Sequence, residues 1–273
     1  MDPYSAALDL LRRLPPTNVS ANLDVISRLC PDIAEDLAVS VDQPLQLKSD
    51  GENGKEYLCC DYNRDGESYR SPWSNAYSPP LADGAVPSET LRELEVGMNE
   101  AFDTYREMYF EGGSSSVYLW DLEEGGFAGV VLLKKALPSA TLQKGSWDSI
   151  HVFEVRERSR QAHYSLTSTI LLYLGSKTIM NEGDGDVSLS GTMTRQVEQD
   201  QTVTSPSQHV VNIGRMIEDI ENKQRNSLSE VYFGKTKDIV AELRSIEGSE
   251  IKNREANLRR ELLGAFGRRA PVE

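Results

Sequence analysis

A long amphipathic pattern behind a run of short strands constrains this chain more than any other feature. From Ser207 to about residue 246, apolar residues recur every three or four positions, which predicts one long helix with a single apolar face. That face comprises Ile213, Ile217, Ile220, Leu228, Val231, Ile239, Leu243 and Ile246. A helix of about 40 residues spans roughly 60 Å, whereas five strands at roughly 4.8 Å each make a narrower sheet. The pattern therefore predicts that part of the helix covers the sheet of a second subunit, in an obligate dimer.

The residues before this helix have the β-branched and aromatic content of strands. We expect five antiparallel strands, at Val117–Leu122, Phe127–Lys134, Trp147–Val155, His163–Leu174 and Val187–Glu198. The turn Glu123–Gly126 predicts a tight hairpin between the first two. A five-stranded open sheet has two edges, and an exposed edge invites pairing with another chain.

Prolines divide the N-terminal part into short elements. Apolar residues at helical spacing before Pro15, before Pro31 and after Pro31 predict a small stalk of three short helices. Residues 46–86 contain too many prolines for a long helix, and Ser88 can cap a helix that runs to about Tyr109.

The chain is thus expected to be an α+β protein of six segments. These are a helical stalk (1–45), a loop and short-strand region (46–86), a connecting helix (87–111), a central antiparallel sheet (112–205), a long helix over the sheet (206–246) and a C-terminal tail (247–273).

Composition excludes several classes of protein. The net charge of −14 argues against nucleic-acid binding, which needs a basic surface. No apolar run approaches the roughly 20 residues that span a bilayer, and the acidic N-terminus lacks the apolar core of a signal peptide. Three cysteines without metal-ligand spacing fit a reducing compartment. We therefore expect a cytoplasmic protein.

One loop imitates a calcium site. Asp61, Asn63, Asp65 and Gly66 match the opening of an EF-hand loop, but its twelfth position, which must be a bidentate Glu, is Pro72. A proline there also prevents a helix from leaving the loop. We expect a polar turn in which Gly66 takes a positive φ, and no metal.

The sequence contains no arrangement typical of an enzyme. It has three histidines, His151, His163 and His209. The first two fall in strand patterns, where packing or surface roles are expected, and the third has no acidic neighbour at useful spacing. Without a nucleophile elbow, a phosphate-binding loop or a dinucleotide motif, we expect neither catalysis nor a cofactor.

The C-terminal segment differs in charge from the rest. From Glu250 to Glu273 it has six basic residues against four acidic ones, a balance of +2. Leu258, Leu262 and Phe266 recur every four residues and predict one apolar stripe on a short basic helix. Two glycines weaken that helix by about 1 kcal/mol each. The stripe can pack on the body of the chain itself or bind a partner.

Several blocks resemble the β subunit of the heterodimeric F-actin capping protein. They are SVDQPL (Ser40–Leu45), RSPWSN (Arg70–Asn75), YFEGGSSSVYLWDLEEGGFAGVVLLKK (Tyr109–Lys135), WDSIHV (Trp147–Val152) and YFGKTKDIV (Tyr232–Val240). They follow the family's order over nearly the whole chain. Departures lie mainly in three loops, at 50–55, 137–144 and 178–186, and in the last thirty or so residues.

The resemblance implies a function and its residues. The chain would be the β subunit of an obligate heterodimer with an α subunit, their five strands each forming a joint ten-stranded sheet. The dimer would cap barbed ends of actin filaments, independently of calcium, and so regulate filament assembly in the cytoplasm and cytoskeleton. A mobile C-terminal helix would bind actin through Leu258, Leu262, Phe266, Arg254, Arg259 and Arg260. Phe266 stands where relatives carry large aliphatic residues.

Further partners are implied by the resemblance alone. They are the actin-related filament of dynactin, regulatory proteins that bind the stalk, and phosphoinositides that compete for basic surface. Three other hypotheses stay open: a calcium-sensing module, a membrane-surface protein that binds through its Arg-rich tail, and an enzyme with a pocket at His151 or His163.

Overall fold

The computed structural model describes residues 2–123, 125–137, 143–158, 160–176, 187–234, 237–238, 254 and 257–258. The chain divides into two compact units, Met1–Glu221 and Asn222–Glu273. The first contains the stalk, the sheet, the helix before the sheet and most of the helix after it. The finer division into six segments stays a prediction, because compactness separates the chain only at Glu221.

The stalk is formed by three short helices that pack on one another. They are α1 (Pro3–Arg13), α2 (Val19–Leu29) and α3 (Ala34–Ser40), and single 3-10 turns beginning at Pro16 and Pro31 separate them. Each helix buries a leucine in a shared apolar centre, Leu11, Leu23 and Leu37 respectively. The prolines end one helix and begin the next, as the sequence predicts.

The central sheet has five antiparallel strands, and this confirms the predicted fold class. The strands are β6 (Ser114–Asp121), β7 (Phe127–Ala136), β8 (Gln143–Arg158), β9 (Gln161–Ser176) and β10 (Val187–Thr202). Each pairs with its neighbours along the chain, so that the order is β10-β9-β8-β7-β6. The last three strands have 16 residues each and are longer than predicted.

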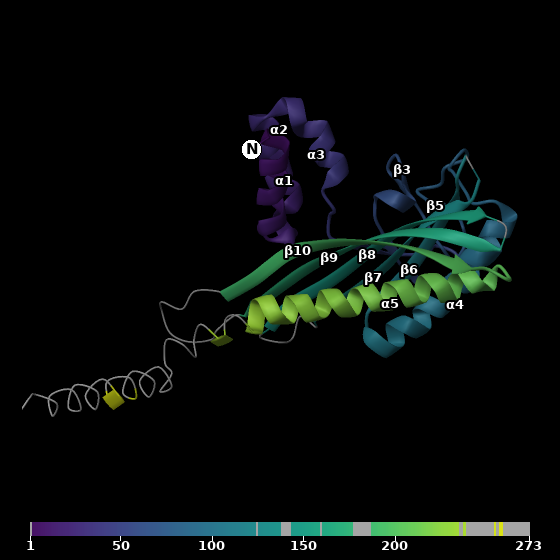
Figure 1. Cartoon of the computed structure of the whole chain (residues 1–273). Coiled ribbons are helices and arrows are strands. Elements are labelled where there is room, and N and C mark those ends of the chain that lie inside the picture. The colour runs from purple at the N-terminus through teal and green to yellow at the C-terminus, as the bar shows by residue number, and fades with distance from the viewer. Residues whose placement is uncertain are drawn as a thin grey trace, which may run out of the picture. The chain divides into compact units, whose positions relative to one another are not determined.

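Two helices cover one face of the sheet, and the stalk stands on the other (Figure 1). The helices are α4 (Glu89–Tyr109) and α5 (Ser207–Ser229). Alternate strand residues such as Val117, Val131 and Phe153 are buried against them in the main core. Ser88 stands at the N-cap of α4 as expected, although its hydroxyl donates to Asp121 Oδ1 (2.7 Å) instead of capping the helix.

Residues 46–78 form two small sheets, which pack on the same face of the main sheet as the stalk (Figure 1). One pairs β1 (Gln46–Ser49) with β2 (Glu56–Cys59), and the other contains β3 (Arg64–Asp65), β4 (Ser68–Arg70) and β5 (Tyr77–Ser78). Leu58 in β2 connects the first of these sheets to the main sheet. Its N–H donates to Ser116 Oγ (2.9 Å), and its carbonyl accepts from the Tyr118 hydroxyl (2.7 Å).

Helix α5 lies along the strands and not across them. Near its start His209 contacts Glu157 at the end of β8, and about three turns later Glu221 contacts Ser149 in the middle of the same strand. A 16-residue strand extends for about 53 Å, so a helix that follows it is not limited by the width of the sheet. The comparison of helix length with sheet width, from which we predicted a second subunit, is therefore wrong. Apolar periodicity identifies the buried face of a helix but not the direction in which the helix runs over the sheet.

The α-helical part of the predicted long helix is shorter than expected. It ends at Ser229 and continues as a π-helical turn, Glu230–Gly234. Of the remaining predicted range, only Lys237 and Asp238 are described, and both are helical. Among the described residues, no helix combines the length and the apolar character that crossing a membrane requires.

Candidate functional site

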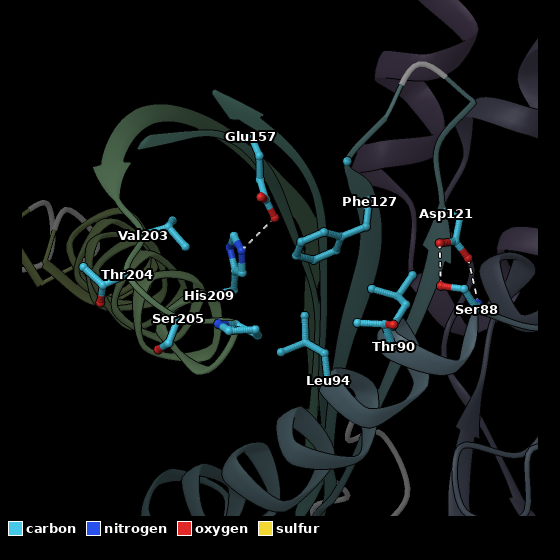
Figure 2. A pocket seen from close by; sticks show the side chains of 13 residues that line it. Ser88, Thr90, Leu94, Asp121, Phe127, Glu157, Val203, Thr204, Ser205 and His209 are labelled. Atoms are coloured by element: carbon cyan, nitrogen blue, oxygen red, sulfur yellow. Dashed lines mark hydrogen bonds and ion pairs between the residues drawn. The ribbon is translucent and has the colours of Figure 1, made fainter. Parts of the chain in front are cut away.

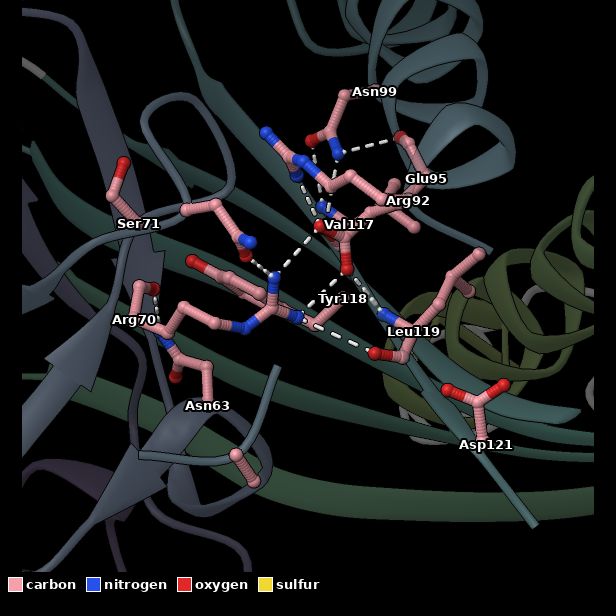
Figure 3. Close-up of polar contacts among 12 residues, drawn as sticks. Asn63, Arg70, Ser71, Arg92, Glu95, Asn99, Val117, Tyr118, Leu119 and Asp121 are labelled. Atoms are coloured by element: carbon pink, nitrogen blue, oxygen red, sulfur yellow. Dashed lines mark hydrogen bonds and ion pairs between the residues drawn. The ribbon is translucent and has the colours of Figure 1, made fainter. Parts of the chain in front are cut away.

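The two edges of the central sheet differ in a way that decides how the sheet can be extended. Strand β6 forms one edge, yet helix α4 covers its outward backbone groups. Asn99 accepts from Val117 N (2.9 Å) and donates to Val117 O (3.0 Å), and Glu95 Oε2 accepts from Leu119 N (2.6 Å). Asn99 thus makes the pair of hydrogen bonds that a neighbouring strand would make (Figure 3). The β6 edge is closed by side chains.

A buried ion pair holds Glu95 in this position. The Arg70 guanidinium donates to both of its carboxylate oxygens (2.8 and 2.7 Å), and Arg92 Nη1 donates to Oε1 (Figure 3). The side chains of Arg70 and Glu95 are 5% and 0% exposed. An unpaired carboxylate at this depth would cost several kcal/mol, and the positive charges of the two arginines offset that cost. The RSPWSN block supplies Arg70, but its partner lies 25 residues away, so no local pattern could reveal the pair.

Strand β10 forms the opposite edge, which is open. It pairs with β9 over all of its 16 residues, and no other strand among the described residues pairs with it. Most of its central side chains, including Thr194, Arg195 and Gln196, are exposed. A long unpaired edge is a template for another strand. It is therefore the structural feature that identifies where a partner sheet can be added.

The stalk offers a second candidate contact surface. Four large apolar side chains on its helices are exposed: Leu10 (50%), Val25 (55%), Leu29 (75%) and Val39 (85%). Solvent-facing apolar residues are common singly. Val25 and Leu29 are four residues apart on α2 and share one face of that helix, so they form a small apolar surface that a partner can cover.

A cluster around Glu221 resembles a catalytic arrangement but cannot act as one. Its carboxylate accepts from Ser149 Oγ (2.7 Å) and the Tyr105 hydroxyl (2.8 Å), and His151 Nε2 lies 3.2 Å away. Burial favours the neutral acid, but the hydrogen bonds from His151, Ser149 and Tyr105 outweigh it and lower the pKa of Glu221. Ser149 donates to the carboxylate and not to the imidazole, and Ser149 and His151 are both 0% exposed. A substrate cannot reach them, so this cluster stabilises the core.

His209 has an acidic partner that the sequence did not reveal. Asn212 Nδ2 donates to the Tyr164 hydroxyl (3.0 Å), so that hydroxyl donates to His209 Nδ1 (2.7 Å) and leaves Nε2–H to donate to Glu157 Oε1 (3.1 Å). Burial lowers the pKa of His209, although Glu157 opposes this effect. The imidazole is neutral, and its tautomer is fixed by three elements, β8, β9 and α5.

The loop that imitates an EF-hand is not arranged around a cation. Asp61 and Asp65 are exposed, whereas Asn63 is buried and turned inward. The Asn63 side chain accepts from Cys60 N (2.9 Å) and donates to Arg70 O (2.9 Å). Gly66 has φ of 57°, as predicted. The loop is a turn held by its own polar side chains.

The predicted actin-binding residues fall at the end of the second unit. Arg254 and Leu258 are helical and exposed, with Leu258 58% exposed. Arg259, Arg260, Leu262 and Phe266 lie outside the described residues. Their arrangement on one helix stays a prediction.

Comparison with known proteins identifies the family. The family model described as "F-actin capping protein, beta subunit" matches residues 4–240. The chain is 54% identical to the F-actin-capping protein subunit beta of Aspergillus oryzae over 265 residues, which cover 97% of this chain and 98% of that protein. The protein of the same name from Drosophila melanogaster is 56% identical, with 96% and 95% covered, and that from Caenorhabditis elegans is 52% identical, with 96% of both covered.

The fold has a counterpart among solved structures. The homodimeric actin capping protein alpha subunit of Plasmodium berghei superposes with a TM-score of 0.52 at 17% identity, covering 87% of this chain and 94% of that one. At such low identity the likeness concerns the fold alone. The match to the family model and the likeness to the sequence relatives, which extends over almost the entire chain, lead to one conclusion: this chain belongs to the F-actin capping protein β-subunit family.

Proposed function

We propose that this chain is the β subunit of a heterodimer that caps the barbed ends of actin filaments without a requirement for calcium. Relatives that carry the capping-protein β-subunit name match it along nearly their full length. The EF-hand-like loop, whose Asn63 is directed inward, offers no calcium dependence. The cluster around Glu221, being inaccessible, gives no support to an enzymatic role.

The open β10 edge carries the proposal. A capping-protein α subunit would add its own five strands there and produce a continuous ten-stranded sheet. The closed β6 edge supports this assignment, since it leaves β10 as the edge at which hydrogen-bonding groups are available. The exposed apolar residues of the stalk, such as Leu29 and Val39, would be covered by the same partner.

The C-terminal tail would then act as the clamp on actin. Burying Leu258, Leu262 and Phe266 in a groove contributes about 1.5–3 kcal/mol for each side chain. Association costs an estimated 4–15 kcal/mol, so one tail alone binds weakly. A second tail from the α subunit and basic surface on the body would raise the affinity through effective concentration. Arg254, Arg259 and Arg260 would supply attraction to acidic actin.

The test is elongation of actin filaments from seeds, with this chain co-expressed with an α subunit. The variants are a truncation after Ser245 and the triple change Leu258→Ala, Leu262→Ala, Phe266→Ala. We expect the intact dimer to stop barbed-end growth well below filament-subunit concentrations, and both variants to dissociate faster while still forming the dimer. The control is Val86→Ala, an exposed apolar side chain of the body (55% exposed).

Each outcome separates the parts of the proposal. If truncation leaves capping unchanged, the tail packs on the body and the α subunit performs the binding. If a folded dimer does not cap at all, the proposed function is wrong, although the family membership still holds.

We infer a cytoplasmic, cytoskeletal location from the same family membership. Dynactin's actin-related filament, stalk-binding regulators and phosphoinositides are further partners that the resemblance implies. Each can be tested by adding the partner to the same elongation assay.

A further inference from the structure

A groove opens at the end of the molecule where α4 and α5 begin. It has a volume of about 500 Å³ and lies within the first compact unit. Its floor is apolar, formed by Leu91, Leu94, Phe127 and the ring of His209, which packs edge-on against Phe127 at 5.2 Å. Figure 2 shows Leu94, Phe127 and His209 between the two helices, with α5 on one side and α4 on the other. This volume suits a small ligand or a few side chains.

Two carboxylates stand at the rim of this floor. Asp121 lies near the start of α4 and Glu157 lies near the start of α5 (Figure 2). Asp121 accepts from Ser88 N (2.8 Å) and Ser88 Oγ (2.7 Å), and Glu157 Oε1 accepts from His209 (3.1 Å). A carboxylate has about four acceptor positions. Both groups can therefore accept further hydrogen bonds from a ligand.

The electrostatic balance of the groove favours a cation. Its lining includes two carboxylates and no lysine or arginine, and the imidazole of His209 is neutral. The N-termini of α4 and α5 oppose the carboxylates with about half a positive charge each. The two full negative charges exceed these two partial charges, so a net negative charge remains above an apolar floor.

We propose that this groove binds a peptide segment of a partner protein in which an arginine or lysine stands between bulky apolar residues. The apolar neighbours would cover Phe127 and Leu94, and the cationic group would reach Asp121 or Glu157. The hydroxyl groups of Thr90, Thr204 and Ser205 line the same groove and can bond to the peptide backbone. The proposal involves neither strand pairing at β10 nor binding of actin by the C-terminal tail, so it extends the proposed function.

Fluorescence anisotropy tests this site with three labelled peptides and the full-length chain purified with its α partner. The probe is Gly-Leu-Arg-Leu-Gly. One matched peptide has Glu in place of Arg, and the other has Ser in place of both Leu residues. We expect a dissociation constant on the order of 0.1 mM for the probe, and at least roughly fivefold weaker binding for each matched peptide.

Isosteric variants connect the binding to the groove. Asp121→Asn combined with Glu157→Gln removes the charges and keeps the acceptors for Ser88 and His209, so it should fold as the wild type and bind the probe at least roughly fivefold more weakly. The matched control is Glu123→Gln, an exposed carboxylate on the same hairpin that does not line the groove. Thr90→Trp, at an exposed position, fills the groove and should abolish binding.

Circular dichroism melts confirm that each variant is folded. The proposal is overturned if the wild type does not bind the probe below about 1 mM, or if the charge-neutral variant binds it as tightly as the wild type. Equal binding of the peptide without leucines would also overturn it, since a simple cation site would then explain the result.

Discussion

Glu95 combines two tasks in one side chain: its carboxylate accepts from the Leu119 amide on β6 and pairs with two arginines. Only the second task needs a charge. A neutral glutamine keeps an acceptor for the amide but leaves the buried Arg70 guanidinium without its anion. This distinction separates the energetic role of the charge from that of the hydrogen bond.

We predict that Glu95→Gln destabilises the folded chain by about 3–5 kcal/mol, the range for removing one partner of a buried ion pair. Urea unfolding of the dimer would measure the loss. Glu93→Gln, which changes an exposed carboxylate on the same helix, serves as the control and should stay within about 0.5 kcal/mol of the wild type. Equal stability of the two variants would mean that Arg70 is satisfied without Glu95.

His209 gives the fold a dependence on pH. Its pKa is lowered from 6.5 by burial, so below about pH 6.5 the unfolded chain binds a proton that the folded chain does not. Stability is therefore complete above that pH and decreases as the pH falls toward the lowered pKa. Protonation would also place a second donor opposite the Tyr164 hydroxyl, which already donates to Nδ1.

We predict that the melting temperature falls more between about pH 7.5 and 5.5 in the wild type than in His209→Gln. A glutamine can accept from Tyr164 and donate to Glu157, as the neutral imidazole does, but it does not titrate. Thermal melts of both proteins at the two pH values provide the measurement. Parallel decreases would assign the pH dependence to other groups.

At the scale of elements, the sequence predicted the number and type of strands and helices well, and their surroundings poorly. β-Branched alternation placed all five strands, and the Gly125–Gly126 turn placed the β6–β7 hairpin. Strands β8 to β10 extend beyond the predicted ends because their last residues are polar and carry no apolar signal. The pairs Arg70–Glu95 and Glu157–His209 could not be predicted, since their members lie 25 and 52 residues apart and become neighbours only through the fold.

Because the β10 edge is open, proline substitutions in β10 should affect two different sets of backbone hydrogen bonds. In an antiparallel pair, successive residues alternate between bonding the neighbouring strand and facing away from it. Of the variants Arg195→Pro and Gln196→Pro, one should therefore weaken the β9–β10 ladder and unfold the chain. The other should leave the ladder intact but prevent co-purification with an α subunit.

Alanine at the same two positions is the matched control, because it removes the side chain and keeps the amide. Both alanine variants should assemble normally. If both proline variants still assemble with the α subunit, the partner does not pair with β10.

At the scale of the whole molecule, the chain exposes a strand edge and apolar side chains that a partner subunit would cover. The 16-residue β10 edge and exposed side chains such as Leu29 and Val39 are hazards for a protein on its own. We predict that the chain expressed alone aggregates or melts without cooperativity, whereas co-expression with an α subunit yields a stable dimer. Sedimentation and thermal melts distinguish the two. A well-behaved monomer with a cooperative melt would contradict this prediction.

The closed β6 edge has a consequence for stoichiometry. In polymer chemistry, a monomer with two reactive ends grows into a chain, and a monomer with one can only form a pair. Asn99 and Glu95 occupy the outward backbone groups of Val117 and Leu119 at the β6 edge, which leaves the β10 edge for pairing, so each copy is monofunctional. Strand pairing between copies of this chain would therefore stop at two.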